Sequence, residues 1–274
     1  MKARPFIKWV GGKTQLLPYL RAAMPVSFGT YYEPFLGGGA LFWDVAPKRA
    51  ILSDANAELV NTYRVVRDQV EALIEALSTL VYDKDLYYRV RGYDTKALTQ
   101  VERAARFIYL NRTCFNGLYR VNKSGGFNVP FGKYTNPMIC DADNLRACSA
   151  ALVNAEIEVR NYDHVVLAAD PGDFVYFDPP YLPASPTASF AAYTAAGFSR
   201  ADQENLARVA RDLVTVGAHV LLSNADTPTA HEIYAGLHVR SVSARRSCSA
   251  KTSGRASVSE VLVSGTPFAA EVAS

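Results

Sequence analysis

Residues 173–181, Asp-Phe-Val-Tyr-Phe-Asp-Pro-Pro-Tyr, form the stretch that decides the fold. The continuous apolar run before Asp178 is typical of a strand buried on both faces of a mainly parallel sheet. Asp178, Pro179, Pro180 and Tyr181 follow at the carboxyl end of this strand, where the ligand sites of such sheets lie. The prolines donate no backbone hydrogen bond, so a carboxylate, a carbonyl and an aromatic ring remain. This set predicts a site for a planar group bearing an amine, and the alternative is a simple strand-ending turn.

Alternating strands and helices extend in both directions from this stretch. Further strands are predicted at 31–36, 49–53, 218–223 and 258–264. Amphipathic helices are predicted at 57–80, 99–112, 141–153 and 200–216. This order indicates an α/β protein with a Rossmann-like, doubly wound, mostly parallel sheet. Because the region 57–150 is mostly helical, we predict that it is inserted into a catalytic domain made of residues 1–56 and 151–274.

A glycine run follows the first predicted strand. Gly37, Gly38 and Gly39 allow a tight turn and a close approach of the backbone to a ligand. Asp54 ends the next strand, at a position that often binds ribose hydroxyls in nucleotide sites. The alternative is a loop of glycines with Asp54 as a helix cap.

A second glycine motif, Gly-Gly-Lys-Thr at 11–14, suggests a phosphate-binding loop. That motif requires a glycine five residues before Gly12, where this chain has Ile7. An ATP-binding loop is therefore rejected. Trp9 and Lys13 remain candidate ligand contacts, but this motif taken alone favours a surface turn.

A basic β-hairpin is predicted near 115–135, with its turn at 123–126. Cations, amides and aromatic side chains alternate along it, as reading of base edges and base stacking require. Stretches 1–32, 103–140 and 233–259 hold 16 of the 29 Lys and Arg residues and no acid. They predict a surface for a polyanion if the fold brings them together, and three separate solvated surfaces if it does not.

Composition excludes several classes of protein. The chain of 274 residues is 49% hydrophobic and 20% charged, which is ordinary for a globular protein. It has no apolar run long enough for a membrane span and no secretory signal, so we expect a cytoplasmic protein. The four cysteines and four histidines lack metal-site spacing, so we expect no metal.

Four blocks together resemble the Dam-type, D12 class of DNA adenine-N6 methyltransferases. They are FIKWVGGK at 6–13, YEPFLGGGALFW at 32–43, NRTCFNGLYRVNKSGGFNVPFGKY at 111–134 and DPPYLPASPTASFAAYT at 178–194. The resemblance spans nearly the whole chain, and the block at 111–134 makes it specific. It implies a site-specific adenine DNA methyltransferase that moves a methyl group from S-adenosyl-L-methionine to N6 of a flipped-out adenine in double-stranded DNA, with GATC as the expected site.

The resemblance also implies roles for individual residues. The cofactor would be bound by Trp9, Lys13, Pro34, Phe35, Gly37, Gly39, Asp54 and Asp178. The target adenine would be held by Asp178, Pro179, Pro180 and Tyr181. The DNA would be contacted by Arg112, Phe115, Asn116, Leu118, Arg120, Asn128 and Pro130, with Phe115 as a stacking wedge. No metal is implied, and we expect a monomer.

Two rival functions stay open from the residues. An acceptor pair that holds an amine also suits a cytosine-N4 methyltransferase, although the hairpin block favours adenine. A catalytically silent DNA-binding relative is the other rival, and Asp54 and Asp178 argue against it. A partner in restriction–modification, a solitary enzyme and a phage enzyme are equally compatible with the sequence.

Overall fold

A seven-stranded sheet forms the centre of the computed structural model, which describes residues 1–122, 125–181, 198–245 and 257–268. The strand order is β3-β2-β1-β4-β5-β7-β6. Strands β1 to β5 run parallel, whereas β7 runs antiparallel to both β5 and β6. The mostly parallel α/β sheet expected from the sequence is confirmed. The strands are β1 (Tyr31–Glu33), β2 (Ala50–Asp54), β3 (Ala155–Val159), β4 (Phe174–Phe177), β5 (His219–Ala225), β6 (His238–Arg245) and β7 (Ser257–Ser264).

Helices cover both faces of the sheet. Alternate residues of β4 belong to different cores: Phe174 and Tyr176 pack with α1, α2 and α3, whereas Val175 and Phe177 pack with α8. This two-sided burial explains the continuous apolar run of that strand. The α-helices are α1 (Leu17–Ala23), α2 (Ala40–Val45), α3 (Ala57–Asp68), α4 (Val70–Ser78), α5 (Lys84–Arg91), α6 (Gln100–Thr113), α7 (Ala142–Leu152), α8 (Arg200–Val216) and α9 (Pro228–Ile233). Short 3-10 helices are η1 (Thr95–Ala97), η2 (Phe115–Gly117) and η3 (Tyr162–Leu167).

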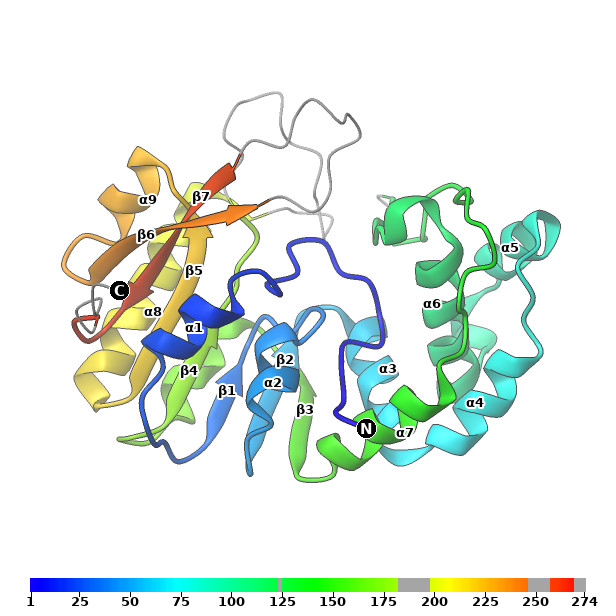
Figure 1. Ribbon diagram of the computed structural model, residues 1–274, viewed down its shortest axis with the longest axis horizontal. Helices are drawn as coiled ribbons and strands as arrows, with labels where there is room; N and C mark the ends of the chain where they lie inside the picture. The colour runs from blue at the N-terminus through cyan, green and yellow to red at the C-terminus, as the bar shows by residue number, and fades with distance from the viewer. Residues whose placement is uncertain (123–124, 182–197, 246–256, 269–274) are drawn as a thin grey trace.

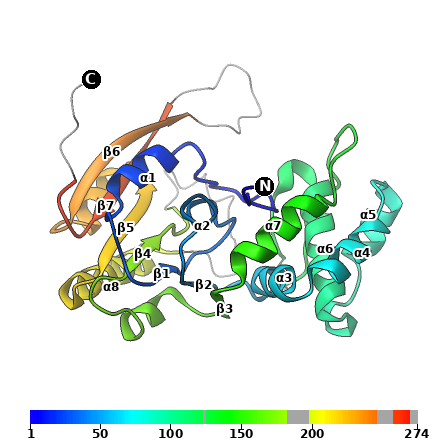
Figure 2. The same cartoon turned by 60° about the horizontal axis from the view of Figure 1, so that its bottom comes forward.

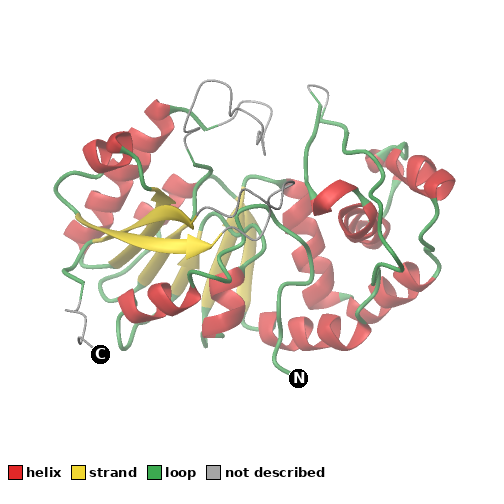
Figure 3. Cartoon of the chain, turned by 45° about the horizontal axis from the view of Figure 1, so that its top comes forward, coloured by secondary structure: helices red, strands yellow, loops and turns green. Residues whose placement is uncertain are grey.

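The helices of the middle of the chain gather beyond the β3 edge of the sheet. Helix α3 lies between the sheet and helices α4 and α6 (Figures 1 and 2). The strands gather in one half of the molecule, and the other half is built of helices and loops (Figure 3). Helix α6 begins at a capping box made by Thr99 and Glu102, which satisfies backbone donors of its first turn. The division into two domains at 57–150 stays a prediction.

Several elements differ from the sequence-based expectation. The helix predicted over 57–80 is two helices, because Gln69 has a non-helical backbone between α3 and α4. The strand predicted over 31–36 ends at Glu33, and the chain then turns through Pro34, which cannot donate a ladder hydrogen bond. Strands β3 and β6 were not expected, because their many polar residues hide the apolar pattern.

The predicted hairpin is also less regular than expected. Its first residues form the 3-10 helix η2, and antiparallel bridges join Cys114 to Phe131 and Val121 to Phe127. We call residues 115–134 the recognition segment. Lys123 of the expected turn, and residues 182–194 of the fourth sequence block, lie outside the described residues.

Candidate active site

The end of β4 is joined to the N-terminal segment by an ion pair whose lysine is buried. The Lys13 Nζ lies 2.8 Å from the Asp178 Oδ1, and the Lys13 side chain is only 5% exposed. The same ammonium donates to the Gly11 carbonyl at 2.6 Å and lies 4.7 Å from the centroid of the Tyr181 ring. The fold therefore brings together two motifs that lie far apart in the sequence.

Asp178 has a further partner on strand β5. The Ser223 hydroxyl donates to Asp178 Oδ1 at 3.0 Å and lies 3.0 Å from the Tyr176 hydroxyl. Burial raises the pKa of the Asp178 carboxyl, and Lys13 and Ser223 oppose this shift. Both contacts reach Oδ1, so this carboxylate is held in one orientation.

The turn after Asp178 is anchored from two other elements. The buried Gln203 of α8 donates through Nε2 to the Pro180 carbonyl at 2.9 Å. The Tyr181 hydroxyl donates to the Glu260 carboxylate on β7. Strand β7, which runs antiparallel beside β5, therefore fixes the position of the Tyr181 ring.

The glycine loop after β1 lies against Trp9. Gly37 has φ +46° and Gly39 has φ +63°, values that favour glycine. A Cβ on Gly37 would lie 2.7 Å from the Trp9 ring, so a side chain at this position would collide with the indole. Trp9 and Gly37 thus form a close contact between the N-terminal segment and the loop.

Asp54 at the end of β2 holds the same loop. Its Oδ2 accepts from the Gly37 backbone N–H at 3.1 Å, and its Oδ1 accepts from the Asn56 backbone N–H at 2.9 Å. Burial raises the pKa of the Asp54 carboxyl to about 6 despite these hydrogen bonds. Above this pH, Asp54 is an ionised acceptor beside the glycine loop.

Glu33 is a buried carboxyl group that sequence reasoning missed. It is 2% exposed, and it accepts a hydrogen bond from the Tyr31 hydroxyl at 2.7 Å. The backbone of Phe42, in the first turn of α2, lies near this carboxyl group and lowers its pKa slightly. Burial raises the pKa of Glu33 to about 8. The available signal was an acid inside the apolar run Tyr-Tyr-Glu-Pro-Phe.

Phe35 and Trp9 pack against different hydrophobic cores. Its ring stacks on Tyr162 with centroids 5.2 Å apart and meets Phe198 edge-on at 5.7 Å. Pro34, beside it in the chain, is buried. These rings join the end of β1 to η3 and to the residues before α8.

The predicted DNA contacts differ in exposure. Phe115 is 49% exposed, and Asn116, Arg120 and Pro130 are exposed as well. The Arg120 Nε donates to the Asn128 Oδ1 at 2.7 Å, so these two side chains are already paired within the segment. Leu118 is half-buried.

Arg112 differs from the other predicted contacts. It is partly buried in α6, and its guanidinium donates to the Phe6 carbonyl at 2.8 Å. Burial lowers the pKa of Arg112. In this structure Arg112 therefore ties the N-terminal segment to α6.

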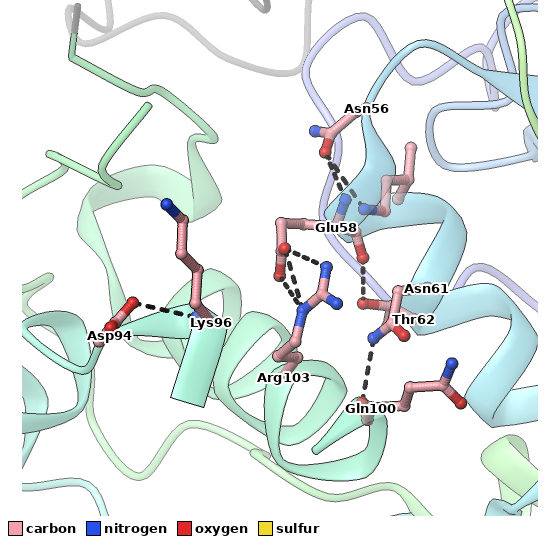
Figure 4. A network of polar contacts seen from close by, with 9 residues as sticks. Asn56, Glu58, Asn61, Thr62, Asp94, Lys96, Gln100 and Arg103 are labelled. Atoms are coloured by element: carbon pink, nitrogen blue, oxygen red, sulfur yellow. Dashed lines mark hydrogen bonds and ion pairs between the residues drawn. The ribbon is translucent and has the colours of Figure 1, made fainter. Parts of the chain in front are cut away.

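Polar contacts fix the N-terminus of α3 just behind Asp54. The Asn56 side-chain oxygen accepts from the backbone N–H groups of Glu58 and Leu59 (Figure 4). The Glu58 carboxylate forms an ion pair with Arg103 on α6 (Figure 4). Helix α3 thus connects the β2 end of the site to the helix that precedes the recognition segment.

Two features are absent from the described ranges, a metal site and a membrane-spanning helix. No three or more His, Cys, Asp or Glu residues gather there in a way that could hold a metal ion. None of the helices in those ranges combines the length and apolarity needed to cross a membrane.

The sheet, the glycine loop and the Asp-Pro-Pro-Tyr turn define a methyltransferase fold of the class that uses S-adenosylmethionine. The family model of the D12 class N6 adenine-specific DNA methyltransferases matches residues 9–248. The chain belongs to this family and is an adenine-specific DNA methyltransferase. This membership decides between adenine and cytosine, and between an enzyme and a silent relative.

Curated relatives cover the chain almost completely. The type II methyltransferase M1.LlaDCHI of Lactococcus lactis subsp. cremoris is 43% identical over 268 residues, which is 95% of this chain and 94% of the relative. The type II methyltransferase M.MjaIII of Methanocaldococcus jannaschii is 40% identical, over 92% of this chain and 94% of the relative. The DNA adenine methylase of Escherichia coli (strain K12) is 36% identical over 95% of each chain.

Proposed function

We propose that this enzyme transfers a methyl group from S-adenosylmethionine to N6 of an adenine that is flipped out of double-stranded DNA. The observation that carries the proposal is the group formed by Lys13, Asp178 and Tyr181 at the end of β4. Strand β1 lies between β4 and β2, and the three strands run parallel. The glycine loop after β1 and Asp54 at the end of β2 therefore lie at the same edge of the sheet as the end of β4. An amine-holding group and a candidate nucleoside-holding group are therefore neighbours.

The residues around the glycine loop fit S-adenosylmethionine. Asp54 is a buried acceptor at the position where ribose hydroxyls are bound in nucleotide sites. Gly37 has no side chain at the point where the loop comes closest to Trp9. When bound, the cofactor supplies an electrophilic methyl group on a sulfonium. We assign Trp9, Pro34 and Phe35 to shaping this site, with Lys13 as the cation between it and Asp178.

The Asp-Pro-Pro-Tyr turn would hold the adenine. Lys13 and Ser223 both contact Asp178 Oδ1, so we assign one N6 hydrogen to Oδ2. The Pro179 carbonyl accepts the second hydrogen, and the Tyr181 ring stacks on the purine. Drawing both hydrogens aside points the N6 lone pair at the methyl group. Alignment of this kind supplies much of a rate enhancement.

The recognition segment would contact the duplex. A base can react at N6 only after it leaves the stack, which costs a few kcal/mol. The exposed Phe115 is placed to fill the vacated space, and Arg120 with Asn128 is placed to read base edges. We assign Asn116, Leu118 and Pro130 to the same surface. We assign Arg112 instead to holding the N-terminal segment, because it donates to the Phe6 carbonyl.

We propose GATC as the site, a monomer as the active form, and residues 57–150 as the target-recognition insert. The test is incubation of unmodified DNA with enzyme and S-adenosylmethionine, followed by base-resolved mapping of methylated positions. N6-methyladenine confined to GATC supports the proposal. Methylation at another sequence overturns the site assignment alone, and no methylation overturns the chemistry.

Replacing Asp178 with alanine tests the assigned chemistry. The Asp178→Ala variant removes the carboxylate that orients N6, and we expect methylation of the mapped site to fall at least about a hundredfold. The measurement is the initial rate of labelled-methyl transfer to a duplex. The matched control is Asp143→Ala, because the Asp143 side chain is 80% exposed on α7. Wild-type activity in folded Asp178→Ala protein would refute the assignment.

A further inference from the structure

Five residues form a closed ring of contacts between the glycine loop and the recognition segment. The rings of Tyr119 and Trp9 stack with centroids 5.5 Å apart, and Trp9 packs on Gly37. Gly37 and Asn56 donate their backbone N–H groups to the two carboxylate oxygens of Asp54, at 3.1 Å and 2.9 Å. The side chain of Asn56 closes the ring beside the Tyr119 hydroxyl, where this polar contact opposes the rise that burial causes in the pKa of Tyr119.

Tyr119 is the member of this ring that belongs to the recognition segment. Its chain neighbours Leu118 and Arg120 are both assigned to DNA under the proposed function. The other four members lie at the site assigned to the cofactor or directly beside it. Tyr119 therefore contacts the cofactor site through two independent routes: a ring stack on Trp9 and a polar contact with Asn56.

Both routes end on groups that are firmly held. Asn56 is fixed by the first turn of α3, to which its side-chain oxygen is bonded (Figure 4). Trp9 and Tyr119 both pack on Phe107 of α6, with ring centroids 6.3 Å and 5.2 Å away. A packed arrangement of this kind shifts between discrete states more readily than it deforms gradually.

We propose that Tyr119 couples cofactor binding to DNA binding. The inference rests on the proposed function, since it takes the two ligands from there. A ligand that fixes Trp9 and the Asp54 loop also fixes both groups against which Tyr119 packs, and so it positions Leu118 and Arg120 for the duplex. Each ligand then tightens the binding of the other by the same factor, because such coupling is reciprocal.

The coupling factor can be measured with S-adenosylhomocysteine, which prevents turnover, and a duplex carrying the mapped methylation site. Calorimetry gives the Kd of S-adenosylhomocysteine with and without saturating duplex, and the ratio of these two values is the factor. We expect about fivefold or more for the wild type, and a value within about twofold of unity for Tyr119→Ala. Since the ratio compares two measurements on one variant, a uniform loss of affinity cancels.

Two further variants sharpen the test. Tyr119→Phe keeps the stack on Trp9 and removes the hydroxyl that faces Asn56, so its factor is expected between those of wild type and Tyr119→Ala. Tyr82→Phe is the matched control, because the Tyr82 hydroxyl bonds Gly132 and Tyr134 in the same segment but lies outside the ring of contacts. Its factor is expected to equal the wild-type value.

The outcomes separate this inference from the proposed function. A wild-type factor of one, or a wild-type factor retained in both Tyr119 variants, overturns the coupling while methylation itself stands. A loss of coupling in Tyr82→Phe equal to that in Tyr119→Phe also overturns it. Any loosening of the recognition segment would then abolish the coupling, and Tyr119 would have no specific role. A wild-type protein that binds neither ligand overturns the proposed function.

Discussion

Glu33 is a buried carboxyl group where strand β1 meets helix α2. It accepts from the Tyr31 hydroxyl on β1, and the Phe42 backbone in α2 opposes the rise that burial causes in the pKa of Glu33. The glycine loop lies between these two elements in the chain, so Glu33 is close to both of its ends. Burial raises the pKa of Glu33 to about 8, and the group keeps its proton at neutral pH.

Stability should fall as the pH rises through the range where only the unfolded chain ionises Glu33. This range runs from the ordinary pKa of 4.5 to about 8. Within it the folded state binds more protons than the unfolded state, so the free energy of unfolding decreases by up to about 1.4 kcal/mol per pH unit. Glu33→Gln should lack this contribution, which urea unfolding at pH 5, 6, 7 and 8 would measure.

The control for this comparison is Glu156→Gln. The Glu156 side chain is 60% exposed on β3, and its variant should follow the wild-type pH dependence. Asp54, whose pKa is raised to about 6, contributes a decrease of the same sign at lower pH in every variant. Parallel curves for wild type and Glu33→Gln would contradict the role given to Glu33.

At the scale of secondary-structure elements, two strands and one helix hold the Asp-Pro-Pro-Tyr turn. Strand β5 supplies Ser223 to Asp178, helix α8 supplies Gln203 to the Pro180 carbonyl, and strand β7 supplies Glu260 to Tyr181. The turn itself has few backbone donors because of its prolines. Its geometry therefore depends on side chains from elements far away in the sequence.

Among these anchors, Gln203 forms a network of several buried hydrogen bonds. Besides donating to Pro180, its Oε1 accepts from the Asn224 Nδ2 at 2.9 Å and from the Tyr234 hydroxyl at 2.8 Å. Gln203→Leu would leave these buried polar groups without their partner, at about 1–3 kcal/mol for each group. We expect a lower free energy of unfolding in urea and a lower kcat, because the turn loosens.

The matched control for Gln203 is Gln100→Leu. Gln100 is exposed at the start of α6. In Figure 4 no dashed line reaches its side-chain amide. This change should alter stability by at most about 0.5 kcal/mol. If Gln203→Leu behaved like Gln100→Leu in both measurements, Gln203 would not be an anchor of the turn.

At the scale of the whole molecule, ion pairs neutralise part of the positive charge that the sequence suggested for a polyanion surface. In the first basic stretch, Lys2 and Arg21 pair with Asp44, and Arg4 pairs with Asp141. Lys13 pairs with Asp178, as described above. The fifth cation, Lys8, instead lies over the Tyr134 ring of the recognition segment, 4.2 Å from its centroid. Within residues 1–32, the cation that lies outside these ion pairs is therefore beside the recognition segment.

Lys133 is an exposed cation of the recognition segment and a candidate phosphate contact. Lys133→Gln should weaken binding to all duplexes by a similar factor. It should also reduce the slope of log K against log salt by about 0.9, the value for one phosphate. Fluorescence anisotropy between low and moderate salt would measure both. Lys48→Gln, at an exposed position before β2, should change neither, and an unchanged slope for Lys133→Gln would exclude the contact.

The sequence by itself determined the local parts of this protein. The apolar run of β4, the glycines after β1 and the periodicity of α6 and α8 are all short-range patterns, because burial and backbone geometry act on neighbouring residues. They predicted the parallel sheet and located Asp54, Asp178 and the recognition segment. The family followed from blocks of the same local kind.

Only the tertiary structure decided which of these parts meet. The pairing of Lys13 with Asp178 and the contacts of Tyr119 with Trp9 and Asn56 join side chains that are far apart in the sequence. Such contacts have no periodic pattern, because each depends on where the packing of the whole sheet and its helices places two side chains. For the same reason the sequence did not show that β7 enters the sheet between β5 and β6.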